Sequence, residues 1–308
     1  MKNKFCLFII LLFIITPNVK GQRRSWKRTR YEAIAGIGVA NFLGELGGSG
    51  KVGQGYYHDF QFSQSRPLFN VAMRYKIFEL LAAKVGLSYG YLHGSDATTN
   101  NIYRHDRNLK FRSPIIELSS QLEFSIIKEP VKHRYSLRRS RKFNIRSLQI
   151  NTYLFAGVAG FWFNPKGKDD GPDGDGKWHS LQPLGTEGQG LIETREKYHR
   201  VQMSIPLGIG FKYAISRKLS IGLEYGGRFT FTDYIDDVST TYVDNAWLVQ
   251  ERGELAGRLA NPGLEELNGY VYQAGDQRGN PNNNDYYMFT IVSLSYKLYT
   301  GRNGMPKF

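Results

Sequence analysis

The strongest constraint on the fold of this chain is a two-residue alternation that runs from Leu81 to Tyr91. Successive side chains of a β-strand point to opposite sides of the sheet, so the alternation predicts a strand with one apolar face and one small, polar face. A tilted strand crosses a bilayer in roughly 9–11 residues, which is the length of this segment. The apolar face comprises Leu81, Ala83, Val85, Leu87, Tyr89 and Tyr91, and the other face comprises Ala82, Lys84, Gly86, Ser88 and Gly90.

Similar segments recur along the sequence, and we predict eight strands from them. Segment 111–127 alternates as cleanly as 81–91, whereas 148–163 carries apolar residues on both faces and leaves its inward face undetermined. The strands are expected at Tyr31–Asn41, Leu68–Lys76, Leu80–Leu92, Phe111–Ile127, Leu148–Phe163, Arg200–Ala214, Leu219–Thr232 and Tyr286–Tyr299.

The links between these strands alternate in length. Two are short, 77–79 and 215–218, and four are long, roughly 42–67, 93–110, 164–199 and 233–285; the link 128–147 departs from the pattern. Outer-membrane barrels have short periplasmic turns and long external loops. We therefore predict an all-β fold, an eight-stranded antiparallel transmembrane up-and-down β-barrel with long extracellular loops and both termini in the periplasm. A soluble sandwich or lipocalin-like barrel is the alternative, but its outer face would be polar.

The predicted barrel spans residues 31–300, and the segments before and after it have distinct compositions. A basic start, an apolar run over 5–15 and small residues near Gly21 are typical of a secretory signal peptide, which we expect at 1–21. The run is shorter than the roughly 20 residues of a spanning helix. Cys6, the single cysteine, lies in this signal, so no disulfide or cysteine-based metal site is expected in the mature chain. A basic arm follows at 22–30, and a short periplasmic tail is expected at 301–308.

Aromatic residues gather near the predicted strand ends, where amphipathic rings favour the membrane interface. We expect them to form two girdles. The outer girdle would comprise Tyr89, Tyr91, Phe161–Phe163, Phe229, Phe231 and Tyr286–Phe289, and the inner one Tyr75, Phe78, Phe124, Phe211, Tyr213, Tyr296 and Tyr299.

The polar faces of the strands predict a charged lumen. An eight-stranded barrel is just wide enough for its interior to be filled by side chains, and isolated charges there would be costly. Pairing in a rigid, plugged interior is therefore expected rather than a pore. The predicted lumen charges are Arg74, Lys84, Lys212, Arg228 and Lys297 against Glu32, Glu117, Glu123 and Glu224.

Charge is also sorted between the two sides of the predicted membrane. The formal net charge is +14, which is typical of nucleic-acid binding, but an exported protein rarely meets nucleic acid. The arm and the link 128–147 are strongly basic, whereas the loop 233–285 is acidic. Two basic segments on one face suggest a docking surface for acidic protein, lipid phosphate or peptidoglycan. Its predicted residues are Arg23, Arg24, Lys27, Arg28, Arg30, Arg138, Arg139, Arg141 and Lys142.

Catalytic and metal motifs find little support in the sequence. Histidine can act as a base for a hydroxyl, and His93 lies near Ser95 and Asp96, but loop histidines among polar neighbours are usually solvated. His105 beside Asp106 and His199 at a strand start are of the same kind. The run 169–176 is rich in Asp and Gly, but its spacing does not match an EF-hand loop and turn chemistry explains it. We expect no catalytic residues, no cofactor and no bound metal.

Several segments resemble PorG-like proteins. These are Tyr31–Gly38 with Asn41–Gly48, Ala156–Pro165 with Leu181–Gly190, and Leu219–Gly226 with Arg228–Thr240. PorG-like proteins are outer-membrane β-barrels of the type IX secretion system of Bacteroidota. The resemblance implies a non-enzymatic role that anchors the periplasmic PorK/PorN ring to the outer membrane. The other expected partner is membrane lipid, and we expect no nucleic acid and no small-molecule substrate. A structural or adhesive outer-membrane barrel is the alternative, and a porin-like channel is a weaker one.

Overall fold

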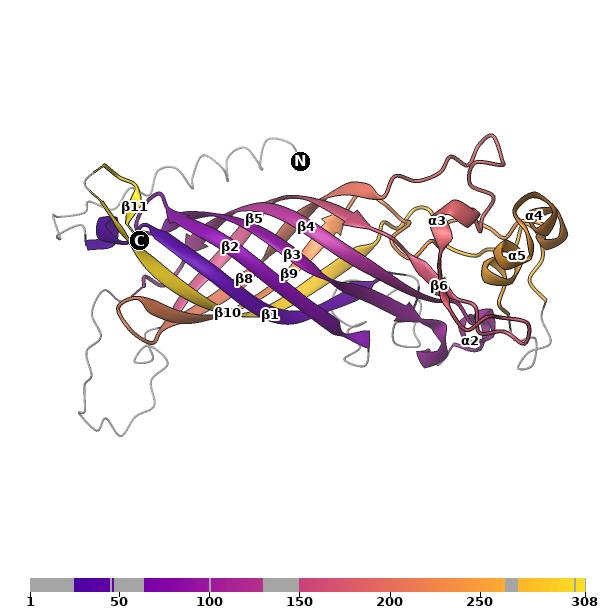
Figure 1. The fold of residues 1–308 in the computed structure, drawn as a ribbon, viewed down its shortest axis with the longest axis horizontal. Coiled ribbons are helices and arrows are strands. Elements are labelled where there is room, and N and C mark those ends of the chain that lie inside the picture. Colours follow the sequence, from indigo (N-terminus) through magenta and orange to yellow (C-terminus); the bar gives the residue numbers. More distant parts are fainter. Residues whose placement is uncertain are drawn as a thin grey trace, which may run out of the picture.

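The computed structural model describes residues 25–44, 46, 64–99, 101–129, 150–263, 271–301 and 303–307, and eight long strands dominate it (Figure 1). All eight predicted strands are present, with ends that differ by a few residues from those expected. They are β1 (Tyr31–Leu43), β2 (Arg66–Lys76), β3 (Leu81–Ser95), β4 (Lys110–Ser125), β5 (Asn151–Phe163), β8 (Val201–Ala214), β9 (Leu219–Thr230) and β10 (Tyr286–Thr300).

The strands form a closed antiparallel barrel. Each long strand pairs with the next one along the chain, and the first and last strands close the ring by pairing β1 with β10. The closing register sets Tyr31 opposite Leu298 and Leu43 opposite Tyr286, so the seam runs the full length of β1. The fold prediction is therefore confirmed as an eight-stranded up-and-down β-barrel.

The outer surface of the barrel is apolar around its whole circumference. Ile37 on β1 is 65% exposed, Leu118 on β4 is 60% exposed and Leu223 on β9 is 42% exposed. A soluble barrel would place polar residues at these positions, whereas a membrane-spanning barrel needs an apolar band that faces lipid. Among the helices in the described residues, none has the length and apolar character that a transmembrane span requires.

Burial settles the inward face of β5, which the sequence left open. Tyr153, Phe155 and Phe161 are buried, whereas Leu154 and Val158 are 48% and 57% exposed. Both faces of β5 are apolar because its outer face meets lipid while its inner face carries aromatic rings into the lumen.

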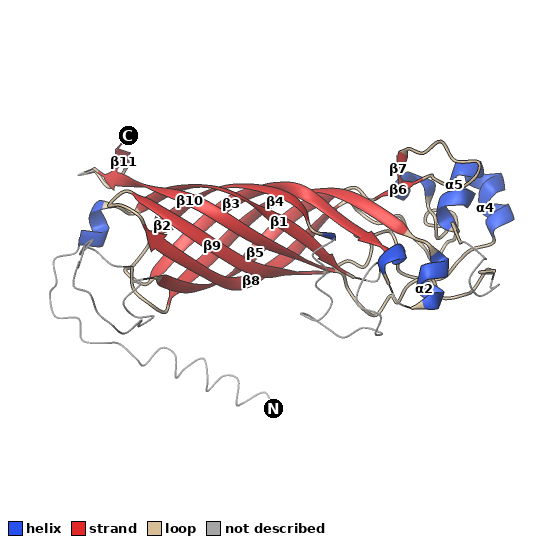
Figure 2. Cartoon of the chain, turned by 90° about the horizontal axis from the view of Figure 1, so that it is seen from below, coloured by secondary structure: helices blue, strands red, loops and turns tan. Residues whose placement is uncertain are grey.

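The two ends of the barrel differ (Figure 1). We call the end at which the described chain begins and finishes the terminal end. It carries the short turns 77–80 and 215–218, the 3-10 helix η1 (Ser25–Arg28) and the two-residue strand β11 (Pro306–Lys307), which pairs with β10. The loop end carries an ordered head, seen beyond the barrel in Figure 2. Its elements are η3 (Asp96–Thr98), α2 (Ile102–Arg107), β6 (Lys166–Lys168), β7 (Trp178–Ser180), α3 (Leu181–Leu184), α4 (Asn245–Arg252) and α5 (Glu254–Ala260).

The outer girdle prediction is wrong for several of its aromatic residues. Phe161, Phe163, Tyr287 and Phe289 are each at most 1% exposed and point into the barrel rather than toward lipid. They form an apolar cluster that plugs the lumen at the loop end, with the ring centroids of Phe161 and Tyr287 5.3 Å apart. The alternation of polar and apolar residues could not separate a ring that faces lipid from a ring that fills the lumen.

The inner girdle agrees better with the prediction. At the terminal end, Tyr213, Tyr296 and Tyr299 are outward and exposed, as expected of rings that lie at a membrane interface.

Candidate functional sites

Strand register places charged side chains in a row across the inner wall. Lys297 lies opposite Glu32, Glu32 lies opposite Arg74, and Arg74 lies opposite Lys84, on four neighbouring strands. Residues that face each other on adjacent strands share one face of the sheet, so these side chains all enter the lumen. The structure buries all nine lumen charges named from the sequence.

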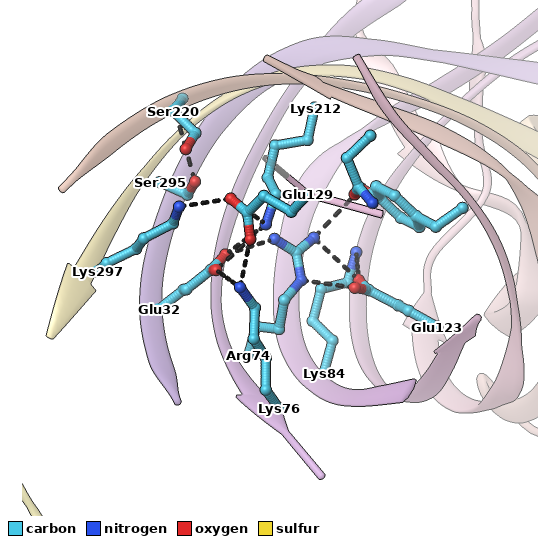
Figure 3. Close-up of polar contacts among 12 residues, drawn as sticks. Glu32, Arg74, Lys76, Lys84, Glu123, Glu129, Lys212, Ser220, Ser295 and Lys297 are labelled. Carbon is cyan, nitrogen blue, oxygen red and sulfur yellow. Dashed lines mark hydrogen bonds and ion pairs between the residues drawn. The ribbon is translucent and has the colours of Figure 1, made fainter. Parts of the chain in front are cut away.

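Arg74 is the centre of the lumen network (Figure 3). Its guanidinium lies 2.8 Å from Glu32, 2.5 Å from Glu123 and 3.5 Å from Glu224. Lys84 binds Glu224 at 2.5 Å and reaches Glu123 at 3.5 Å. Multiple ion pairs per charge offset the cost of removing these groups from water.

A second part of the network lies nearer the terminal end. Lys212 is 3.1 Å from Glu32, and Lys297 is 2.5 Å from Glu129. Lys76 contacts both Glu32 and Glu129. The whole network therefore draws charged groups from every long strand except β5 and joins them around one closed cross-section of the barrel.

The sequence prediction missed three members of this network. Lys76 follows Arg74 by two residues and so shares its inward face, a signal that the alternation of β2 carries. Tyr153 donates a hydrogen bond of 2.7 Å to Glu224, but its inward direction was hidden by the ambiguous phase of β5. Glu129 comes from the link after β4 and folds back into the barrel mouth, where no strand periodicity applies.

Arg228 and Glu117 form a separate pair closer to the loop end. Their side chains are 3.2 Å apart, and Tyr287 donates a hydrogen bond of 2.8 Å to Glu117. The Arg228 guanidinium also stacks on Phe289, 4.0 Å from the ring centroid. The aromatic cluster adjoins this pair, so the interior is filled by ion pairs at one end and by rings at the other.

The predicted docking surface is only partly described. Arg23, Arg24, Arg138, Arg139, Arg141 and Lys142 lie outside the described residues, as does the predicted signal peptide. Arg30 is fastened to the barrel, because it donates a hydrogen bond of 2.9 Å to Tyr75 and stacks on Trp26. Arg28 is exposed at the terminal end, next to Lys27. Lys27 and Arg28 are thus the described part of the predicted basic surface at this end of the barrel.

The head is organised around a buried ion pair that sequence reasoning did not find. Arg278 is 2.9 Å from Glu187, and both side chains are almost fully buried. Glu187 also accepts hydrogen bonds from the backbone N–H groups of Ser239 and Thr240, at 2.9 and 3.0 Å. Three segments far apart in the sequence are therefore held together by one carboxylate.

Asp237 lies beside this pair in a left-handed backbone conformation, with φ of 67°. Tyr198 and Thr186 donate hydrogen bonds of 2.6 and 2.5 Å to its carboxylate. Burial raises the pKa of Asp237 to about 6, although Arg278 and these hydrogen bonds act in the opposite direction. The group therefore titrates near neutral pH, unlike an exposed aspartate.

The histidine and acid candidates do not assemble into a catalytic arrangement among the described residues. His93 lies on the outward face of β3, where its Nδ1 atom bonds the backbone oxygen of Phe111 at 2.7 Å. Asp96 is fully buried and paired with Arg107 at 2.7 Å. Both groups are therefore occupied by structural contacts, and neither is positioned as a base beside a hydroxyl nucleophile.

A small cluster forms in the Asp-rich run. Ligand atoms of Asp169, Asp175 and His179 lie within 4.8 Å of one another. His179 bonds Asp175 at 2.9 Å, a contact that the sequence did not predict. Arg258 already donates to both carboxylate oxygens of Asp169, at 2.7 and 3.1 Å, so this carboxylate is neutralised by a protein cation.

Comparison with known families gives a match over part of the chain. A domain of unknown function (DUF6089) matches residues 189–255, which run from the end of one long loop through β8 and β9 into α5. A search of curated proteins found no match to this chain.

Comparison with solved structures finds membrane barrels of low sequence identity. The chain is similar to Ail, the attachment invasion locus protein of Yersinia pestis, with 8% identity, 88% of this chain and 99% of that chain covered, and a TM-score of 0.37. It is similar to a major outer membrane protein from Thermus thermophilus, with 13% identity, 87% and 99% covered, and a TM-score of 0.37. It is also similar to OprG from Pseudomonas aeruginosa, with 6% identity, 88% and 96% covered, and a TM-score of 0.35.

Proposed function

We propose that this chain is a non-enzymatic outer-membrane component of the type IX protein secretion system of a member of the Bacteroidota, and that it anchors the periplasmic PorK/PorN ring to the membrane. The observation that carries this proposal is the filled lumen. Ion pairs around Arg74 and an aromatic cluster around Tyr287 occupy the interior, which leaves the two end surfaces as the places where the barrel acts. A rigid barrel with working surfaces at its ends is suited to anchoring.

The unequal ends support the orientation that this role requires. Short turns and both ends of the described chain gather at one end, and the head gathers at the other, as in barrels whose termini are periplasmic. The terminal end would then meet periplasmic proteins. Its basic character, begun by Lys27 and Arg28 and extended by the link 128–147 in the sequence, favours an acidic partner. The resemblance to PorG-like proteins supplies the identity of that partner.

The test is co-purification of PorK and PorN with the full-length barrel from solubilised outer membranes. A charge-reversed variant is expected to lose most of the ring protein, because it opposes the charge complementarity of the docking surface. This variant carries Lys27→Glu, Arg28→Glu, Arg138→Glu, Arg139→Glu, Arg141→Glu and Lys142→Glu. Lys177→Glu changes an exposed charge in the head and serves as the control, with unchanged recovery expected. Equal recovery of the ring with the charge-reversed variant would sink the proposal.

A structural or adhesive barrel is the second candidate, and the ordered head favours it. The buried pair of Arg278 and Glu187 gives the loop end a fixed shape, which a surface that contacts another cell or matrix requires. Retention of the ring by the wild-type barrel separates the first candidate from this one. A porin-like channel would instead give stepwise conductance in a planar bilayer, and a filled lumen predicts none.

A further inference from the structure

One part of the barrel surface combines aromatic rings and cations just above the apolar band. It lies at the loop end, where β4 extends past the barrel and pairs with β6, which in turn pairs with β7 (Figure 2). Tyr91 follows Tyr89 by two residues and so shares its outward face. Arg112 lies on the same face, two residues from Pro114, which is opposite Tyr91. We call the outward side chains of Tyr91, Arg112, Lys166 and Trp178 the rim patch.

The Arg112 guanidinium lies near two aromatic rings. Its centre lies 5.8 Å from the ring of Tyr91 and 4.8 Å from the ring of Trp178. Stacking of this kind fixes the plane of the guanidinium while leaving its N–H groups available. Among the described residues, Arg112 Nε is buried and has no hydrogen-bond partner. This nitrogen is covered by protein, whereas Arg112 as a whole is only half-buried, so a ligand would meet the terminal amino groups of its guanidinium.

A second cation lies directly opposite. The register of β4 and β6 pairs Arg112 with Lys166, so two like charges face each other on adjacent strands. Like charges in this position destabilise a sheet. Neighbouring Lys110 and Lys168 share the carboxylate of Asp170, at 2.6 and 3.7 Å. Within the described part of the chain, no such carboxylate lies within ion-pair distance of Arg112 or Lys166.

We propose that the rim patch binds a phosphate monoester on the headgroup of a lipid in the leaflet at the loop end. A monoester carries about −1.5 to −2 charges at neutral pH, which matches two adjacent cations better than the single charge of a phosphodiester. Arg112 supplies directional hydrogen bonds, and Lys166 supplies a compact charge. Ile116 on β4 lies opposite Tyr89, and Arg112 lies four residues from Ile116 toward the loop end. At about 3.3 Å per residue along a tilted strand, Arg112 is roughly 10 Å above Tyr89, which is headgroup height.

The proposal rests on the membrane orientation given above and not on the periplasmic partner. Its test is native mass spectrometry of the full chain in detergent micelles, titrated with diphosphoryl lipid A. The double variant Arg112→Gln with Lys166→Gln is expected to bind this lipid about tenfold more weakly, the loss expected when charge-assisted hydrogen bonds are removed. Lys218→Gln is the matched control, because Lys218 also packs on two rings, of Tyr296 and Tyr299, but at the terminal end.

Three further ligands distinguish the sources of binding. Lipid A from which both phosphates have been removed is expected to bind as weakly to the wild-type chain as diphosphoryl lipid A does to the double variant. Phosphatidylglycerol, a phosphodiester, is expected to bind less than lipid A, and inorganic phosphate is not expected to displace the lipid. Equal binding of lipid A to the wild-type chain and the double variant would overturn the proposal, as would equal binding of phosphatidylglycerol and lipid A. Heat-dependent gel mobility verifies that each variant is folded. Failure to recover PorK and PorN in the co-purification test would not change the lipid binding measured here.

Discussion

At the scale of single residues, Glu32 forms three of the ion pairs in the lumen network. It is fully buried and lies 2.8 Å from Arg74 and 3.1 Å from both Lys76 and Lys212. Removing one partner of a buried ion pair leaves the other charge uncompensated, which costs far more than an exposed pair contributes. The carboxylate therefore links β1 to β2 and, across the lumen, to β8 through charge rather than through apolar packing.

Glu32→Gln is expected to lower the free energy of unfolding by about 3–5 kcal/mol, because it keeps the side-chain shape but leaves three lumen cations without this carboxylate. Urea unfolding of the barrel in lipid vesicles measures the change. Glu79→Gln is the control, since Glu79 pairs with Lys128 where both side chains are exposed, and a loss of about 0–1 kcal/mol is expected there. Equal losses in the two variants would contradict the assigned role of Glu32.

Asp237 gives the head a dependence on pH. Its pKa of about 6 in the folded chain exceeds the ordinary value of 3.8, so the folded head holds the proton more tightly than the unfolded chain does. The contribution of protonated Asp237 to the stability of the folded head is therefore fully present below about pH 4 and is lost as the pH rises through about 6. The change is up to about 3 kcal/mol, because one pKa unit corresponds to about 1.4 kcal/mol.

Hydrogen-exchange protection of the Ser239 and Thr240 amides, corrected for intrinsic rates, is expected to fall between pH 4 and pH 7. Asp237→Asn removes the titrating group and tolerates the left-handed backbone, so its protection is expected to stay level over this range. A fall of the same size in Asp237→Asn would show that another group is responsible.

At the scale of elements, β5 and β8 fit together because glycine residues on β8 leave room for aromatic rings on β5. A Cβ atom on Gly210 would lie 2.2 Å from the ring of Tyr153, whose hydroxyl bonds Glu224. Gly208 leaves similar room for the ring of Phe155. The small residues of β8 thus set how the aromatic residues of β5 lie inside the barrel.

Gly210→Ala is expected to destabilise the barrel by about 1–3 kcal/mol, since overpacking displaces Tyr153 from Glu224. Gly160→Ala on β5 is the matched control, because a Cβ there meets no atom within 4 Å. The urea midpoints of the two variants in vesicles report the difference. A midpoint for Gly210→Ala equal to that of the control would mean that Tyr153 does not depend on this space.

The strands were predictable because lipid outside and charge inside give opposite faces opposite polarity. That contrast disappears in β5, where Leu154 faces lipid and Phe155 faces the interior, and so the phase of this strand needed the structure. The short elements β6, β7 and α3 were not predicted either. Strands of three residues have no measurable periodicity, and they exist here because β6 pairs with the extended end of β4.

At the scale of the whole molecule, the lumen was predictable and the head was not. Charges on alternating strands enter a common space once the barrel closes, so the phase alone places Lys84 and Glu224 in the same lumen. The head depends instead on contacts between loops, such as Glu187 with Arg278, which are 91 residues apart. No local pattern marks such a pair, and only the tertiary arrangement brings it together.

The pairing of β1 with β10 has a consequence for how the protein is made. Because the first and last strands are neighbours, the seam cannot close until the end of β10 has been synthesised. Any shorter nascent chain would present two bare strand edges and an apolar surface, both of which promote aggregation. A chain truncated before β10 is therefore expected to aggregate unless another protein covers these edges.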